Sequence, residues 1–202
     1  ATQTCGPIKA LVVVPHLQNP LGSIMPDNHK ARLVEFCYNQ NIPLIEDDTY
    51  SALSNSETPL KALKAWDKTG NVIHCASLHK VLAPGLRLGW ISAGRWQARV
   101  EMLKHVQSRN NEELSQQAAA DFIASSAYDR HLRRLRAALL NQREQTAQAI
   151  ATHFPSATRM NNPQGGLALW VELPDQLSSK QLFDAALAEK ILIAPGLMFS
   201  NS

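Results

Sequence analysis

The stretch from residue 42 to residue 50, IPLIEDDTY, decides the fold class of this chain. Its first four residues, Ile42–Ile45, form a short apolar run of the kind that predicts a buried β-strand. The next five, Glu46–Tyr50, are polar, as expected where such a strand emerges into solvent. The same succession recurs where the apolar run Val72–Ala76 leads into Ser77–Lys80. The sequence therefore predicts two buried strands with polar side chains at their carboxyl ends.

A further strand and a helix are expected upstream. The run Leu11–Val14 predicts a strand that ends at Pro15, and the helix after it has Asp27 as its expected N-cap. Four side chains of this helix are expected to face the sheet: Leu33, Val34, Phe36 and Cys37. Strands that alternate with helices are typical of a mostly parallel α/β sheet, in which the carboxyl ends of the strands line the ligand crevice. The three strand ends are therefore expected to meet at one site.

The remainder of the chain predicts another strand, several helices and a second unit. Leu88–Ala93 is expected to run antiparallel, because its connection from Ala76 is too short for a crossover helix. Helices are expected at Ala98–Val106, Glu112–Ser125 and Arg130–His153. A strand, a helix and a short strand are then expected at Leu167–Leu173, Ser179–Glu189 and Ile191–Ala194. These last elements form a smaller α/β unit.

The composition is that of an ordinary folded protein, with 202 residues of which 45% are hydrophobic and 18% charged. Disordered and collagen-like chains are excluded. The net charge of +3 is too even to indicate a nucleic-acid or membrane surface, and no apolar run approaches the roughly 20 residues of a membrane span. Cys5, Cys37 and Cys75 lack disulfide spacing, and the seven histidines lack paired ligand spacing. We therefore expect a soluble, cytoplasmic protein with reduced thiols and no metal site.

Lys80 is the first candidate for chemistry, because an amine held in an apolar neighbourhood just past a buried strand becomes more nucleophilic. Asn19, Asp47 and Arg87 lie at or near neighbouring strand ends. Pyridoxal phosphate chemistry requires this combination: a lysine for the imine, a carboxylate for the pyridine nitrogen and an arginine for the phosphate.

Two further side chains fit the same chemistry. Tyr50, together with Asn19, could tune the ring hydroxyl, and Ser77 could donate to the phosphate. The alternative interpretation is that these polar residues merely cap loops at the strand ends. Residue types and spacing alone leave both interpretations open.

Four ordered motifs add a resemblance to a known family. They are Gln18–Gly22 (QNPLG), Glu46–Tyr50 (EDDTY), Ser77–Lys80 (SLHK) and Ala83–Trp90 (APGLRLGW). In order and spacing they resemble the signature of the fold-type I, class I/II aminotransferases. Residues 131–136, 165–170 and 194–196 resemble the long helix and small domain of that family. The resemblance implies a pyridoxal 5'-phosphate (PLP)-dependent transferase fold of the aspartate aminotransferase type: an α/β fold with a large, mostly parallel-sheet domain and a smaller α/β domain.

The resemblance also implies roles in binding the cofactor PLP. Lys80 matches the Schiff-base lysine that forms the internal aldimine, and Asp47 matches the aspartate on the pyridine nitrogen. Asn19 matches the asparagine that contacts the ring oxygen, and Tyr50 matches the tyrosine on the ring hydroxyl.

The phosphate site is implied in the same way, with one departure. Ser77 and Arg87 match phosphate ligands of the family. His79 stands where the family usually has a serine, and we expect it to reach the phosphate or to pack against it.

The subgroup that the chain resembles most is the aminotransferase-like domain of MocR-type regulators of the GntR superfamily. The expected division is residues 1–127, the later part of the PLP-binding large domain, and residues 128–202, the linking helix and a truncated small domain. We expect the chain to be a fragment, because the family's glycine-rich phosphate turn, ring-stacking aromatic residue and carboxylate-binding arginine have no match between Ala1 and Ser202. Cofactor binding by this segment alone is expected to be weak.

Three hypotheses of function follow. The first is a sensor that binds PLP and an amino compound and shifts a homodimer between DNA-binding states, DNA being bound only by an N-terminal winged-helix domain encoded before Ala1. The second is a stand-alone aminotransferase that moves an amino group from an amino acid to a 2-oxo acid through Lys80. The third is a catalytically inactive α/β domain.

Overall fold

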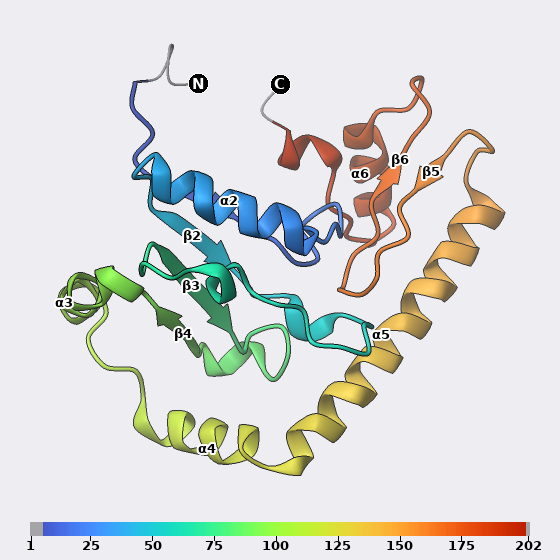
Figure 1. The fold of residues 1–202 in the computed structure, drawn as a ribbon. Helices are drawn as coiled ribbons and strands as arrows, with labels where there is room; N and C mark the ends of the chain where they lie inside the picture. The colour runs from blue at the N-terminus through green and yellow to red at the C-terminus, as the bar shows by residue number, and fades with distance from the viewer. Residues whose placement is uncertain (1–5, 201–202) are drawn as a thin grey trace.

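The structure, a computed structural model, describes residues 6–200 and contains two separate β-sheets (Figure 1). The larger sheet has four strands in sequential order: β1 (Leu11–Val13), β2 (Leu44–Asp47), β3 (Val72–Ser77) and β4 (Gly89–Ser92). The first three strands are parallel, with Ile45 of β2 paired to both Val12 and Ile73. The carboxyl ends of β1, β2 and β3 therefore lie at one edge of the sheet, as the sequence predicts.

The last strand of this sheet, β4, pairs antiparallel with β3, with Trp90 opposite Ala76. Residues 78–88 connect the two strands and contain only a short 3-10 turn, Pro84–Leu86. The expected antiparallel direction is confirmed, since so short a connection cannot return the chain to the opposite end of the sheet.

One face of the sheet is covered by helix α2 (Asp27–Asn39), which follows β1. Val34 and Cys37 of α2 are buried in one core cluster with Leu44 and Val72 of the sheet. Two details of the prediction are wrong. Pro26 occupies the N-cap position and Asp27 is the first helical residue. Phe36 is 55% exposed and does not belong to the core cluster between α2 and the sheet.

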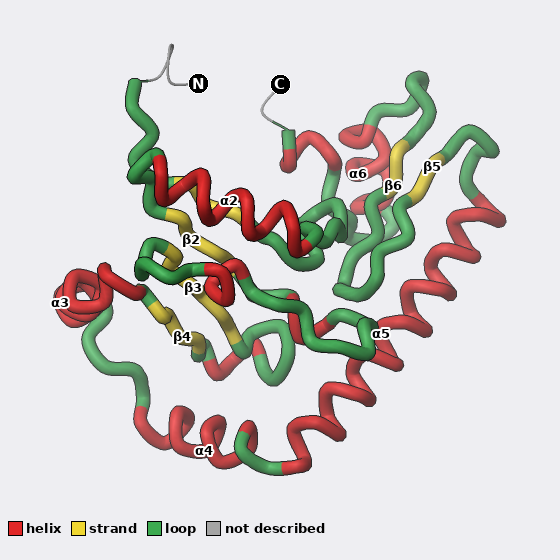
Figure 2. Tube along the Cα trace, viewed as in Figure 1, coloured by secondary structure: helices red, strands yellow, loops and turns green. Residues whose placement is uncertain are grey.

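A second core cluster forms where the long helices pack against the strand ends. Helices α3 (Gln97–Gln107), α4 (Glu113–Ile123) and α5 (Ser126–His153) follow one another and curve around the sheet, with only a short connection between α4 and α5 (Figure 2). This cluster contains Leu17, Leu53, Leu78, Val81, Ala119 and Leu132. The three expected helices are thus present. Through this cluster, α4 and α5 pack against the segments that follow β1, β2 and β3.

Beyond α5 lies the smaller unit, whose two-stranded antiparallel sheet joins β5 (Arg159–Met160) to β6 (Val171–Glu172). Helix α6 (Ser179–Ala188) packs beside it (Figure 1). The expected strand Leu167–Leu173 is reduced to β6, and β5 was not predicted. Residues 191–194 form no strand, because no other described strand pairs with them.

Other expectations are met in part. Cys37 and Cys75 are free thiols, whereas Cys5 lies outside the described residues. None of the helices between residues 6 and 200 combines the length and the apolar character that crossing a membrane requires. The division at residues 127 and 128 stays a prediction.

Candidate functional site

The turn after β1 places Asn19 at the carboxyl edge of the sheet. Gln18 shapes this turn, since its carbonyl accepts the Gly22 N–H at 2.5 Å and its side-chain Oε1 accepts the Leu21 N–H at 3.1 Å. Gly22 has φ +67°, and a Cβ atom there would lie 2.6 Å from the side chain of Pro163. The turn therefore requires glycine at this position, both for its backbone conformation and for its close contact with the smaller unit.

Three of the seven predicted site residues line one cavity of about 210 Å³: Asn19, Tyr50 and Lys80. They come from the segments that follow β1, β2 and β3, respectively. Residues 165–168 of the smaller unit close the cavity from the other side. The tertiary structure thus brings these three side chains together, and their roles toward a cofactor stay predictions.

The side chains of the three predicted site residues in this cavity are unpaired. Lys80 is partly buried, and within residues 6–200 its ammonium forms no hydrogen bond or ion pair. The same holds, over that range, for the Asn19 amide group and the Tyr50 hydroxyl. Burial, and after it the charge of Asp47, raise the pKa of Tyr50. The cavity therefore presents an amine, an amide and a neutral phenol, all free to bind a polar ligand.

Asp47 ends β2, where it is paired with Cys75 of β3. Its Oδ1 atom accepts the backbone N–H and the hydroxyl of Thr49, at 3.1 and 2.5 Å. These bonds fix the carboxylate and leave its Oδ2 atom without a partner among the described residues. Asp47 does not line the 210 Å³ cavity.

The three predicted phosphate ligands form a connected group of their own. The hydroxyl oxygen of Ser77 accepts the N–H of His79 at 3.1 Å. Arg87, which is exposed and has φ +52°, places Nη1 3.3 Å from Nδ1 of His79. A guanidinium and a hydroxyl in one group suit an anion, although none of the three lines the 210 Å³ cavity.

The structure also contains a hydrogen-bonded bridge that the sequence did not predict. It joins Asp48 to His16 and His74, next to the segments that carry the candidate site. Asp48 Oδ1 is 2.6 Å from His16 Nδ1, and Asp48 Oδ2 is 3.2 Å from His74 Nε2. The only signal in the sequence is that His16 and Asp48 each lie within three residues of the end of a strand. The pairing of His74 depends on the sheet register and has no local signature.

The bridge alters the pKa values of its members. Burial alone would raise the pKa of Asp48, but hydrogen bonds from His16 and His74 outweigh it and lower that pKa from 3.8 to about 2. The hydrogen bond to Asp48 raises the pKa of His74. Burial also raises the pKa of Glu46, whose carboxylate accepts the N–H groups of Leu63 and Lys64 at 2.6 and 3.0 Å.

Potential metal ligands occur in this network. His16, Glu46 and Asp48 place one ligand atom each within 4.8 Å of the others. Each of these side chains already has hydrogen-bond partners: backbone N–H groups for Glu46, and one another for His16 and Asp48. In this structure the three side chains therefore use their potential ligand atoms for hydrogen bonds.

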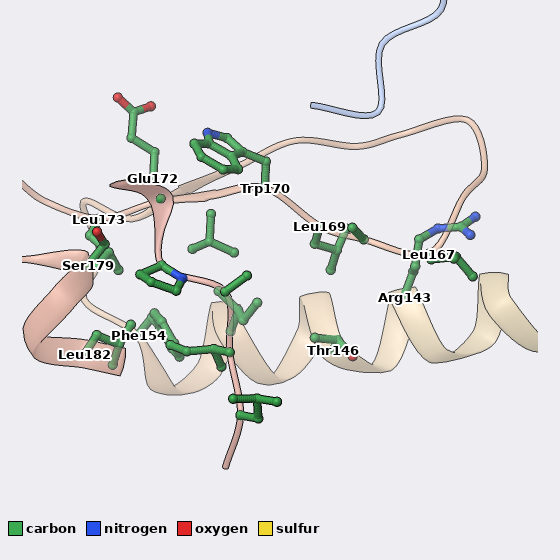
Figure 3. A pocket seen from close by; sticks show the side chains of 18 of the residues that line it. Arg143, Thr146, Phe154, Leu167, Leu169, Trp170, Glu172, Leu173, Ser179 and Leu182 are labelled. Atoms are coloured by element: carbon green, nitrogen blue, oxygen red, sulfur yellow. The ribbon is translucent and has the colours of Figure 1, made fainter. Parts of the chain in front are cut away.

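A larger cavity, of about 780 Å³, lies in the smaller unit between α5, α6 and residues 167–173 (Figure 3). Figure 3 shows Arg143 and Leu167 at one end and Ser179 and Leu182 at the other. Arg143 donates from Nη1 to the Gly166 carbonyl at 2.6 Å, and its Nη2 is buried without a partner among the described residues. None of the seven predicted site residues lines this mostly apolar cavity.

Comparison with known proteins identifies the family. The profile of the family "Aminotransferase class I and II" matches residues 3–200, and the chain therefore belongs to this family. The uncharacterized HTH-type transcriptional regulator YdcR of Escherichia coli is 40% identical over 196 residues, which are 96% of this chain and 42% of YdcR. The chain thus spans less than half the length of this relative.

Solved structures agree on the fold. Kynurenine aminotransferase from Pyrococcus horikoshii, solved in complex with PMP, has a TM-score of 0.84 and 28% identity, over 93% of this chain and 47% of its own. LysN is an α-aminoadipate aminotransferase from Thermus thermophilus, solved in complex with N-(5'-phosphopyridoxyl)-L-leucine. It has a TM-score of 0.85 and 28% identity, over 93% of this chain and 49% of LysN. The predicted fold-type I aminotransferase fold and the resemblance to the aminotransferase domain of regulators are confirmed.

Proposed function

We propose that this chain is the PLP-binding aminotransferase-like domain of a MocR-type transcriptional regulator, which holds PLP through Lys80 and senses an amino compound. The observation that carries the proposal is the unpaired ammonium of Lys80, which lies on one cavity with Asn19 and Tyr50. An amine that has no hydrogen-bond partner and lines a cavity is available to a ligand, and an amine can bind an aldehyde covalently as an imine.

The residues present fit PLP. The free Oδ2 atom of Asp47 is available to hold a proton on the pyridine nitrogen, and Asn19 and Tyr50 offer donors for the ring oxygen. The connected group of Ser77, His79 and Arg87 offers donors for the phosphate. When bound, PLP supplies an electron sink for the bond changes at the amino-bearing carbon of its ligand.

The regulator is favoured over an enzyme by the 40% identity to an HTH-type transcriptional regulator. In this proposal the whole protein is a cytoplasmic homodimer that binds an amino compound here and DNA through a separate N-terminal domain. The alternative is a stand-alone aminotransferase that transfers an amino group between an amino acid and a 2-oxo acid, which the likeness to solved aminotransferases supports. Amino transfer to a 2-oxo acid by the purified full-length protein would favour the alternative.

Borohydride reduction tests the role of Lys80. The full-length protein is loaded with PLP, reduced and digested, and the labelled peptide is identified by mass spectrometry. We expect the label on Lys80 and its loss in Lys80→Ala. Lys180→Ala is the matched control, because Lys180 is exposed on α6 and pairs with Asp184 at 2.7 Å. A label on any lysine other than Lys80 would contradict the proposal.

A further inference from the structure

The hydrogen-bonded bridge joins three neighbouring segments at the edge of the sheet that carries the candidate site. His16 comes from the segment after β1, Asp48 follows β2 and His74 lies within β3. Asp48 uses one carboxylate oxygen for each histidine, at 2.6 Å to His16 and 3.2 Å to His74. The bridge therefore ties three adjacent strands together through side chains, in addition to their backbone ladder.

The imidazole ring of His16 is fixed at both of its nitrogen atoms. His16 is completely buried, and both of its ring nitrogens face oxygen atoms. Nε2 lies 3.2 Å from the carbonyl of Lys61, and Nδ1 lies 2.6 Å from Oδ1 of Asp48. The bridge therefore holds the Asp48 carboxylate between the two imidazole rings of His16 and His74.

Other charged groups lie around the bridge. Glu46 lies beside it and is buried, with its carboxylate held by two backbone N–H groups. Lys30 is also buried and donates at 2.8 Å to the same Lys61 carbonyl that His16 contacts. The charge of Lys64 opposes the protonation of His74 and acts to lower its pKa. His16 thus lies near two carboxyl groups, and the Lys30 ammonium contacts the same Lys61 carbonyl as His16.

We propose that the His16–Asp48–His74 bridge is a positioning element for the cofactor site, an inference that rests on the proposed function. Asp48 directly follows Asp47 and is also held through its N–H, which donates to the Cys75 carbonyl at 2.8 Å. His16 lies three residues before Asn19. The bridge fixes the backbone from which Asp47 and Asn19 project, so that both side chains are oriented before the cofactor binds.

Two buried carboxylates of the sheet allow a matched comparison. Asp48 lies at the carboxyl end of β2, whereas Asp67 lies before the amino end of β3 and is 1% exposed. Asp67 accepts the N–H groups of Asn71 and Val72 at 3.0 and 2.8 Å, so its loss also removes buried hydrogen bonds. Asp67→Asn therefore controls for loss of stability at a distance from the candidate site.

The test measures PLP binding by full-length Asp48→Asn and Asp67→Asn. We expect Asp48→Asn to weaken PLP binding about tenfold or more, as the loss of a hydrogen bond to a charged group predicts. We also expect it to move the pH at which the visible absorbance of bound PLP changes. Asp67→Asn should lower stability and leave both readouts unchanged. Equal effects of the two variants on PLP binding would overturn the proposal.

A conservative variant separates positioning from simple packing. His16→Asn keeps an N–H donor close to the position of Nδ1, whereas His16→Ala removes it. We expect His16→Asn to retain more of the PLP affinity than His16→Ala. Equal PLP affinity in the two variants would contradict a positioning role.

Nitrogen NMR of the protein without cofactor tests the bridge itself. We expect a slowly exchanging ring proton in the hydrogen bond between His16 and Asp48, and we expect this signal to be lost in Asp48→Asn. Absence of this signal, or its displacement by added Zn²⁺, would overturn the bridge.

These readouts separate the two proposals. If borohydride labels another lysine, the proposed function fails, while the His16 spectrum still reports on the bridge. If Lys80 is labelled but Asp48→Asn binds PLP as Asp67→Asn does, only the positioning role fails.

Discussion

Asp48 shows how a single residue can be central to this site without matching any motif role. Its neighbour Asp47 matches the family signature. Asp48 instead forms hydrogen bonds with His16 and His74, which lie 32 and 26 positions away in the chain. The side chain of Asp48 is 12% exposed, so both bonds form where water competes weakly. The ionised form of Asp48 therefore stabilises the folded state.

The pH dependence of stability follows from these pKa shifts. The pKa of Asp48 falls from 3.8 to about 2 on folding, so its contribution is complete above pH 3.8 and is lost as the pH falls toward 2. The pKa of His74 rises above 6.5, so its contribution is complete below pH 6.5 and is lost as the pH rises through the higher value.

Urea unfolding across this pH range checks the prediction. Asp48→Asn should lower the free energy of unfolding by about 2 kcal/mol at pH 6, and the difference from the unmodified protein should shrink toward pH 2. A difference that stays constant with pH would show that only packing was lost.

At the scale of elements, the loop from residue 161 to residue 166 joins the smaller unit to the larger sheet. The side chain of Asn161 donates to the Leu21 carbonyl at 2.8 Å, and the Gly166 N–H donates to the Leu53 carbonyl at 3.1 Å. Arg143 of α5 holds the same loop through the Gly166 carbonyl. The wall of the 210 Å³ cavity therefore depends on contacts between three separate elements.

Gly165→Ala tests this loop. Gly165 has φ +150°, and a Cβ atom there would lie 2.4 Å from the Leu53 carbonyl oxygen. We expect the substitution to lower the free energy of unfolding by about 1–3 kcal/mol, because both the backbone conformation and the close approach exclude a side chain.

The control for this prediction is Gly85→Ala. A Cβ atom on Gly85 would have nothing within 4 Å, and Gly85 has no positive φ. Urea midpoints of the two variants should differ clearly, and similar midpoints would indicate that the loop relaxes without loss of stability.

At the scale of the whole molecule, several apolar side chains lie in solvent. Leu192, which lines the 780 Å³ cavity, is 81% exposed, and Met198 is 69% exposed. Val106 on α3 and Leu114 on α4 are 73% and 77% exposed. We expect the exposed apolar surface at the cavity to bind other apolar molecules.

An environment-sensitive apolar dye checks this expectation. The 202-residue chain should bind the dye, and Leu192→Lys should reduce the fluorescence, because Leu192 lines the cavity. Leu192 is mostly exposed, so the substitution should leave the free energy of unfolding nearly unchanged. Val106→Lys is the matched control remote from the cavity, and an equal loss of fluorescence in both variants would place the dye elsewhere.

The sequence predicted most elements of the larger sheet because their signals are local. Short apolar runs predicted β1 to β4, and the short connection before β4 predicted its direction. In the smaller unit the same reasoning missed β5 and placed a strand at residues 191–194. A two-residue strand has no period to detect, and an apolar run becomes a strand only where another strand pairs with it.

By itself, the sequence determined the three parallel strands, their polar carboxyl ends and the meeting of Asn19, Tyr50 and Lys80, because a parallel α/β sheet places successive strand ends at one edge. Only the tertiary structure decided the His16–Asp48–His74 bridge and the close contact of Gly165 with Leu53. These contacts join residues far apart in the chain, and they depend on the strand register and on how the helices pack, neither of which a local pattern contains.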